Sequence, residues 1–250
     1  MSVLLALTDI ESTILSNITS IPPPKDNRFN LGNLSASCED ALSKIVLSCE
    51  FLTCVPIPAL LPLVPMIPEI GNIKKNLREF LNYLDPIDQF SNIICLVPRC
   101  SEKGVQSAIQ EILNRCTTEL NKNNTIVGLI YGAAVFYSPL RDSICFKNNN
   151  VFCIHETANI TFTLPNPPFN ITDNTIIEAI AFANPEQVCT QCNKDIINTF
   201  GNFLENNTLA LQVLAQAGIN QILIDTMKIG IAVKCGINFE DGEVPNNPSQ

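Results

Sequence analysis

The sequence predicts an all-α protein, a disulfide-stapled multi-helix array with one small β-hairpin near residues 145–154. Apolar residues recur at helical spacing along most of the chain, and only one short stretch departs from this period. Eleven cysteines are typical of a disulfide-bonded protein from an oxidising compartment and are unusual in the reducing cytosol. The 250 residues are 46% hydrophobic and 16% charged, so the chain can bury a substantial core and is not intrinsically disordered.

The first expected element is an amphipathic helix over residues 2–16, which ends before three consecutive prolines at 22–24. A second helix is predicted over 38–53, with Ser37 as its N-cap. The segment 55–68 is apolar but carries five prolines, so short turns are expected there instead of a long helix.

Four helices are expected in the middle of the chain. An apolar stripe predicts a helix over 73–84, and Asp85 caps another that ends near Cys95. Ser101 caps a helix that ends near Cys116. Residues 125–137 are apolar on every face, so this helix is expected to be the most buried one.

The helical period is lost at Cys145–Cys153, where two short strands around an Asn-rich turn predict a hairpin closed by a disulfide between these two cysteines. Residues 157–170 are expected to form an extended loop. Helices then follow at 173–183, 186–205, 208–217 and 219–234, with Gly218 ending the third of them.

The expected organisation has four parts. They are an N-terminal helix and Pro linker (1–30), a six-cysteine helical module (31–138), a hairpin plus C-terminal helical module packed on the first (139–238), and a disordered tail (239–250). No internal repeat of fixed period is present in the sequence.

All eleven cysteines are disulfide candidates: Cys38, Cys49, Cys54, Cys95, Cys100, Cys116, Cys145, Cys153, Cys189, Cys192 and Cys235. Gaps of 10, 4, 40, 4 and 15 residues separate the first six, which favours nested bridges, although six cysteines allow about 15 pairings. The number is odd, and Cys235 is the candidate for the unpaired thiol. Cys189 and Cys192 form a C-x-x-C motif, but no βαβ pattern surrounds it, so structural disulfides are favoured over redox chemistry or zinc.

Several blocks of sequence resemble a family of secreted fungal cysteine-rich proteins of uncharacterised function. They are Cys38–Leu42 with Cys49, the run Cys54–Leu63, the cysteines 95, 100 and 116, and the blocks Pro139–Cys145 and Val151–Cys153. The resemblance covers residues 34–205 and implies an extracellular protein of the cell surface or wall. It carries no catalytic residues, and this chain lacks the Ser-rich tail that such proteins often use for a lipid anchor.

Six N-x-[ST] sequons support an extracellular location and are glycosylation candidates: Asn17, Asn33, Asn123, Asn159, Asn170 and Asn206. Asp9 and Glu11 interrupt the apolar N-terminal run, so we expect a mature chain from which a signal peptide has been removed. No run of 18 apolar residues is present, so no membrane span is predicted.

Composition excludes several classes of function. A net charge of −9 argues against nucleic-acid partners. His155 is the only histidine and is expected to be a solvated residue at the hairpin end. Asp85 and Asp88 are better explained as acidic residues at the start of a helix than as the two catalytic carboxylates of a glycosidase. No catalytic residue, cofactor or metal site is predicted.

The remaining functional signal is an excess of apolar residues in 55–68 and 124–137. This excess either fills the core, forms a surface for self-association or contact with cell-wall components, or lines a cavity for a lipid or other hydrophobic small molecule. The residues expected in such a surface or cavity are Leu60, Leu61, Leu63, Val64, Met66 and Ile67. The favoured hypothesis is a non-enzymatic, N-glycosylated structural protein; the alternatives are a carrier and, third, a hydrolase.

Overall fold

The computed structural model describes residues 34–66, 84–163 and 183–245, and it confirms the all-α class with one small hairpin and a set of disulfides. The helices expected at 2–16, 73–84 and 173–183 lie outside the described residues. Within the described part, eight helices begin at a Ser, Thr or Asn side-chain cap.

The first half contains α2 (Ala36–Val46), α3 (Cys49–Cys54), α4 (Ile57–Leu60), the 3-10 helix η1 (Leu61–Met66), α6 (Leu84–Ile94), α7 (Glu102–Arg115), α8 (Thr117–Asn121) and α9 (Thr125–Val135). The second half contains α10 (Tyr137–Cys145), β1 (Lys147–Asn148), β2 (Val151–Phe152), α11 (Cys153–Thr163), α13 (Pro185–Val188), α14 (Gln191–Glu205), α15 (Thr208–Gln216) and α16 (Gln221–Cys235).

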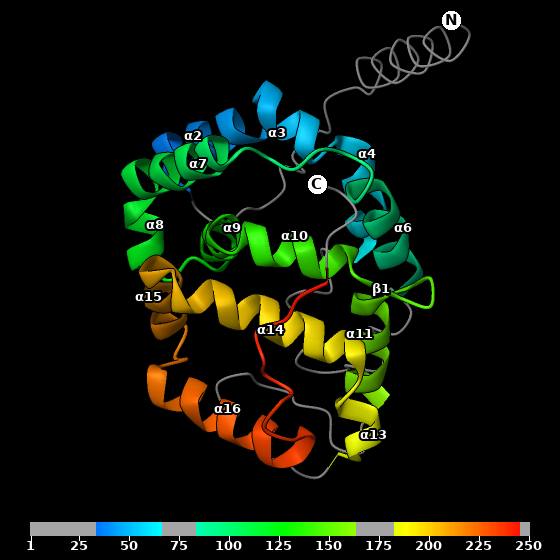
Figure 1. Cartoon of the computed structure of the whole chain (residues 1–250). Helices are drawn as coiled ribbons and strands as arrows, with labels where there is room; N and C mark the ends of the chain where they lie inside the picture. Colours follow the sequence, from blue (N-terminus) through cyan, green and yellow to red (C-terminus); the bar gives the residue numbers. More distant parts are fainter. Residues whose placement is uncertain (1–33, 67–83, 164–182, 246–250) are drawn as a thin grey trace, which may run out of the picture.

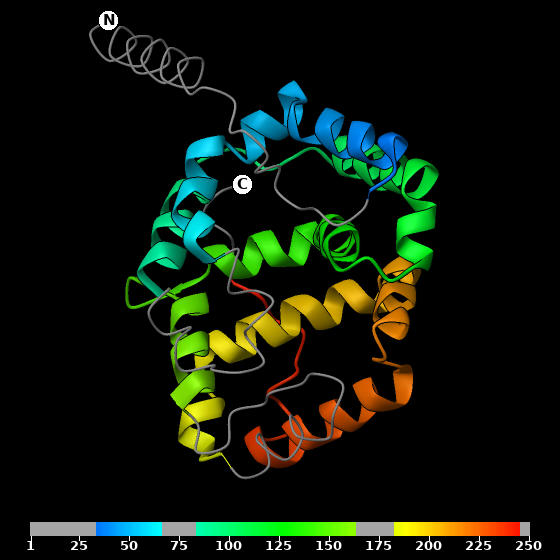
Figure 2. The same cartoon turned by 180° about the vertical axis from the view of Figure 1, so that it is seen from behind.

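The helices lie in successive rows (Figure 1). α2 and α7 form one end of the molecule, α9 and α10 the next row, α14 and α15 a third, and α16 the opposite end. α6 and α11 run along one side and connect these rows, and the view from behind shows the same order (Figure 2).

The largest core cluster joins α2, α7, α9 and α15. Its most buried members include Ile109, Ile112 and Val127, each at most 2% exposed. At the end of α9, the Phe136 ring lies 5.7 Å from the Phe203 ring and connects this core to α14. Burial of these side chains supplies the main driving force for this half of the fold.

The helix expected over 38–53 is in fact two helices. Ser35, not Ser37, caps α2 by accepting a hydrogen bond from the backbone N–H of Cys38. Ser48 ends the first helix and starts the second, because its hydroxyl donates to the Ile45 carbonyl and accepts from the Phe51 N–H.

The prediction for 125–137 is wrong in one respect, because α9 is not buried on every face. Val127, Tyr131 and Val135 face the core, whereas Leu129 is 55% exposed. α7 and α15 pack against parts of the helix surface, and neither covers the side that carries Leu129.

The hairpin is present, but its predicted disulfide is wrong. Lys147 pairs with Phe152 and Asn148 with Val151, and the turn residues Asn149 and Asn150 adopt positive φ values of 50° and 66°. Cys145 ends α10 and bonds to Cys95, while Cys153 begins α11 and bonds to Cys192. Each cysteine therefore ties the hairpin to a neighbouring helix instead of closing it.

The segment after the hairpin also differs from expectation. Residues 153–163 form α11, which packs on α14, instead of an extended loop, and residues 164–170 lie outside the described part. The helix expected over 186–205 breaks after Val188, and Thr190 caps α14 by accepting from the Asn193 N–H.

Five disulfides connect the helices: Cys38–Cys116, Cys54–Cys100, Cys95–Cys145, Cys153–Cys192 and Cys189–Cys235. The first two are nested as the spacing predicts, but the six cysteines do not form three nested bridges, because Cys95 bonds to Cys145 and Cys49 is free. The prediction that Cys235 is unpaired is wrong, because the free and exposed cysteine is Cys49. Both cysteines of the C-x-x-C motif form structural bridges to other helices.

Candidate functional site

An apolar pocket lies among α2, α3, α7 and α9 and has a volume of about 680 Å³. Its apolar lining comes from all four helices: Leu42, Ile45, Val46, Phe51, Val55, Val105, Ala108, Ile112, Ile130, Ala133 and Ala134. This volume falls within the range of roughly 300–1,000 Å³ typical of small-molecule sites. The arrangement can hold a hydrophobic molecule away from water.

The walls of this pocket are fixed by covalent and polar contacts. The disulfide Cys38–Cys116 joins α2 to the end of α7, and Cys54–Cys100 joins α3 to the segment before α7. The Glu50 carboxylate, also on α3, accepts hydrogen bonds from the backbone N–H of Ser101, at 2.9 Å, and from its hydroxyl. These contacts hold three of the four walls together.

Gly104 permits this contact between α3 and α7. A Cβ atom at this position would overlap the Glu50 carboxylate, so only glycine lets the carboxylate lie against the first turn of α7. Placing a carboxylate at a helix N-terminus is also electrostatically favourable.

The pocket includes only part of the apolar segments singled out in the sequence. Segment 124–137 contributes Ile130, Ala133, Ala134 and Tyr137, and segment 55–68 contributes Val55. Of the predicted residues with described side chains, none lines it: Leu60 and Leu63 are partly buried elsewhere, and Leu61 is 61% exposed. The side chains of Val64, Met66 and Ile67 lie outside the described part. The lining from α2 and α7 follows ordinary helical periodicity, which does not distinguish a pocket wall from a core.

A second hollow of about 690 Å³ is polar. It lies between α10 and α14, where Arg99 forms an ion pair with Asp142 at 2.9 Å and donates to the Ser138 hydroxyl at 2.9 Å. Val244 and Pro245, from the C-terminal segment, form one of its walls.

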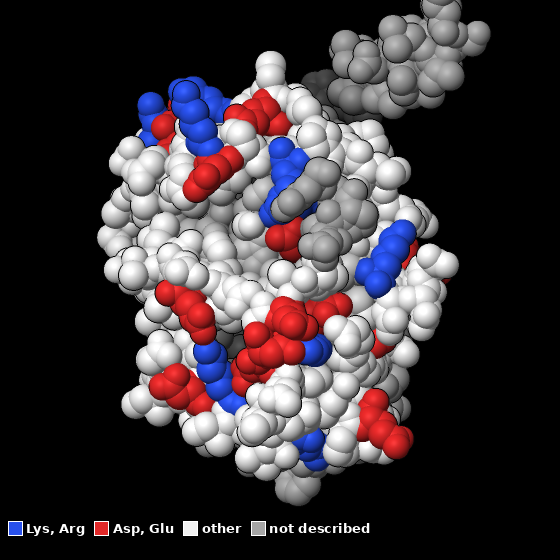
Figure 3. All heavy atoms as spheres, viewed as in Figure 1, with Lys and Arg blue, Asp and Glu red and all other residues white. Residues whose placement is uncertain are grey.

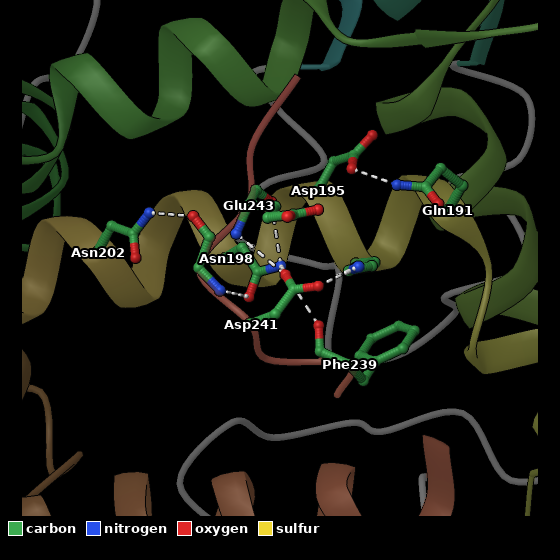
Figure 4. Close-up of polar contacts among 9 residues, drawn as sticks. Gln191, Asp195, Asn198, Asn202, Phe239, Asp241 and Glu243 are labelled. Atoms are coloured by element: carbon green, nitrogen blue, oxygen red, sulfur yellow. Dashed lines mark hydrogen bonds and ion pairs between the residues drawn. The ribbon is translucent and has the colours of Figure 1, made fainter. Parts of the chain in front are cut away.

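The C-terminal segment was expected to be disordered from residue 239, but residues 239–245 lie across α14 (Figure 1). Phe239 is buried, and the Asn198 side-chain amide donates to the carbonyls of Phe239 and Glu243 and to the Asp241 carboxylate (Figure 4). Asn202 adds a bond to the Gly242 carbonyl. Residues 246–250 lie outside the described part.

Acidic side chains gather where this segment crosses α14 (Figure 3). The hydrogen bond from Lys194 to Asp241 lowers the pKa of this aspartate and raises the pKa of Lys194. Burial raises the pKa of Asp195, which accepts a hydrogen bond from Gln191 at 2.6 Å. These interactions fix the segment in place, and the carboxylates of Asp195 and Asp241 each have a partner on α14.

His155 lies on α11 and is not a fully solvated residue. Its Nδ1 atom is 2.7 Å from Asp88 Oδ2 on α6, and the histidine side chain is 28% exposed. Ser91, one turn further along α6, donates its hydroxyl to the Ile87 carbonyl. His155 and Asp88 line neither of these two hollows, and the pair connects α6 to α11.

A family model described as a domain of unknown function, DUF7729, matches residues 20–242. The chain belongs to this family. No curated protein and no solved structure matches it. The match covers both halves of the molecule, so the pocket and the C-terminal segment up to Asp241 and Gly242 are parts of the DUF7729 domain.

Three of the six predicted N-glycosylation sites are accessible in the structure. Asn123, Asn159 and Asn206 are exposed, whereas Asn17, Asn33 and Asn170 lie outside the described part. Over the residues that the structure describes, no helix is long and apolar enough to cross a bilayer. The same residues contain no group of three or more His, Cys, Asp or Glu side chains placed to bind a metal ion.

Proposed function

We propose that this DUF7729 protein is a secreted, non-enzymatic carrier that binds a hydrophobic small molecule in the pocket among α2, α3, α7 and α9. The observation that carries the proposal is the pocket itself, about 680 Å³ in volume and lined mainly by aliphatic side chains. Its walls are held by two disulfides, so the site is largely preformed. A preformed site loses less conformational entropy on binding.

The covalent structure supports the extracellular part of this proposal. Five disulfides are typical of a protein that folds outside the reducing cytosol. Exposed sequons at Asn123, Asn159 and Asn206 are accessible for N-glycosylation. The resemblance to secreted fungal cysteine-rich proteins leads us to propose a fungal cell surface as its location. A shift in mass after enzymatic deglycosylation of the native protein tests the glycoprotein assignment.

Binding of an apolar fluorophore, N-phenyl-1-naphthylamine, tests the carrier function. We expect saturable fluorescence enhancement with one site per chain. Ala133 is exposed and lines the pocket, so Ala133→Phe inserts a ring into it and weakens binding by about tenfold or more.

Ala215→Phe is the matched control, because Ala215 is an exposed alanine on α15 outside the pocket lining. This control should bind like the unmodified protein. Equal binding by both variants, or no saturable binding by any of the three proteins, would exclude the carrier function.

Self-association is a second candidate function, and two observations favour it. Cys49 is an exposed free thiol, and α16 exposes Ile222, Ile229 and Val233 at 76%, 65% and 83%. A disulfide-linked dimer on non-reducing gels that disappears in Cys49→Ser would support a structural role. A monomer under both reducing and non-reducing conditions, at all concentrations in size-exclusion chromatography, would rule it out.

A further inference from the structure

We infer that the pocket ligand is an uncharged lipid-like molecule with an oxygen acceptor, such as a ketone, ester or alcohol, which accepts a hydrogen bond from Tyr137. This inference rests on the proposed carrier function and specifies its ligand class. Three observations carry it: the charges that line the pocket are already paired, the Tyr137 hydroxyl has a spare proton, and most of the remaining lining is apolar.

The charged residues in the pocket lining are Lys44, Glu50 and Glu111, and each has a partner. Lys44 Nζ lies 2.7 Å from Asp40, and Glu111 lies 2.8 Å from Arg115 Nε. Glu50 accepts from the Ser101 N–H and hydroxyl.

An anionic ligand such as a fatty acid would therefore have to displace Asp40 from Lys44 in a lining that carries two carboxylates and one ammonium group. Because like charges repel in a partly desolvated site, a carboxylate ligand is disfavoured. A cationic ligand gains little, because both glutamates are already bonded. An uncharged ligand neither has to break these ion pairs nor meets charge repulsion from the pocket lining.

Tyr137 supplies the only aromatic hydroxyl among the residues that line the pocket. Its oxygen accepts a hydrogen bond from the backbone N–H of Cys100 at 2.8 Å, and Cys100 lines the same pocket. This bond occupies the hydroxyl oxygen as an acceptor and leaves the hydroxyl proton for another partner.

A hydroxyl group whose oxygen accepts a hydrogen bond directs its own proton away from that donor. Among the described residues this proton has no acceptor. An oxygen of the bound ligand would satisfy it, because an unused donor in a low-dielectric site is costly. The hydrogen bond would fix the polar end of the ligand near Cys100 and leave its hydrocarbon part against α2, α7 and α9.

Displacement of N-phenyl-1-naphthylamine by four ten-carbon compounds tests this assignment. Decane, 2-decanone, 1-decanol and decanoate at pH 7 share chain length and differ in the group offered to Tyr137. We expect the ketone and the alcohol to bind about fivefold to tenfold more tightly than decane, and decanoate to bind more weakly than the alcohol.

Tyr137→Phe removes only the hydroxyl and should abolish the advantage of the ketone over decane. Tyr131→Phe is the matched control, because this buried tyrosine on α9 does not line the pocket. Should Tyr137→Phe fold poorly, the carbonyl carbon of ¹³C-labelled 2-decanone provides a second readout. Its resonance should move downfield on binding to the unmodified protein, as for a carbonyl that accepts a hydrogen bond.

Two outcomes overturn the ligand class while the carrier function stands. The first is saturable fluorophore and decane binding with no preference for the ketone and no downfield carbonyl shift. The second is tighter binding of decanoate than of 1-decanol. If neither the fluorophore nor decane binds, the carrier function itself fails, and the ligand assignment fails with it.

Discussion

Asp195 is a buried carboxylate whose ionisation destabilises the folded protein. Burial raises its pKa in the folded protein above the value of about 3.9 expected in the unfolded chain, and Asp241 nearby adds to the shift. The folded state therefore disfavours the ionised form, and this destabilisation appears as the pH rises through 3.9 and is complete above the folded-state pKa.

Asp195→Asn should consequently stabilise the protein at pH 7, raising its Tm by roughly 2 °C, since about 1 kcal/mol corresponds to 2–4 °C at this size. The asparagine oxygen can still accept from Gln191. Thermal denaturation at pH 7 and at pH 3 measures the effect, and the gain should vanish at pH 3, where the aspartate is protonated in both states. An equal gain at both values would show that charge is not the cause.

Asn198 is the residue on which the C-terminal segment depends. Its amide bonds to Phe239, Asp241 and Glu243, and its oxygen accepts from the Gly242 N–H. We expect Asn198→Ala to lower the free energy of unfolding by about 2 kcal/mol, because several buried polar groups lose their partners. Amide hydrogen exchange should rise in residues 239–245.

Asn202→Ala is the control, because it removes a single bond to Gly242 in a more exposed position. It should lower the free energy of unfolding by less than Asn198→Ala does, and amide exchange in residues 239–245 should be slower than in that variant. Equal exchange in both variants would show that Phe239 alone holds the segment.

At the scale of single residues, the sequence predicted those that act on near neighbours. Ser101 caps α7, and Gly218 adopts a positive φ of 88° after α15, as expected. The roles of Asn198, Glu50 and Tyr137 were not predictable, because their partners lie between 37 and 51 residues away in the chain. Such contacts depend on how the helices pack, which periodicity does not specify.

At the scale of elements, apolar periodicity predicted most of the described helices, but it missed α11 and did not fix the helix boundaries. Ser48 and Thr190 each lie inside an apolar pattern that continues past them, yet each caps a new helix. A hydroxyl that bonds to the backbone can interrupt a helix without any change in the apolar period. The pairing of the cysteines was equally unpredictable from the sequence, because bridges such as Cys95–Cys145 join cysteines 50 residues apart.

α16 lies at one end of the molecule (Figure 1) and is weakly attached among the described residues. It has no buried residue, it contacts α13, and the bridge Cys189–Cys235 holds its end. We expect the double variant Cys189→Ser with Cys235→Ser to increase amide exchange across α16 by tenfold or more while exchange in α7 and α9 stays unchanged.

The paired control is Cys38→Ser with Cys116→Ser, which removes the bridge between α2 and the end of α7. Because this bridge lies in the main core, its loss should destabilise the whole domain by about 2–5 kcal/mol. If removal of the α16 bridge lowered global stability as much as this control, α16 would belong to the main cooperative unit.

At the scale of the whole molecule, the cysteines divide the chain into two covalently closed rings. The first ring is closed by two overlapping disulfides, Cys38–Cys116 and Cys95–Cys145, so every peptide bond from 38 to 145 lies inside a disulfide loop. The second ring is closed in the same way from 153 to 235 by Cys153–Cys192 and Cys189–Cys235. No bridge spans the hairpin between them. The polypeptide between Cys145 and Cys153 is thus the sole covalent link between the two rings.

A protease site inserted between Asn149 and Asn150 should therefore release two separate fragments on a non-reducing gel after cleavage. The same insertion at Lys122–Asn123, within the first ring, should give a single band until a reductant is added. In an oxidising environment rich in proteases, a nick almost anywhere in either ring leaves the molecule in one piece. A single cut separates the two rings only when it falls between Cys145 and Cys153, the segment that contains the two-asparagine turn.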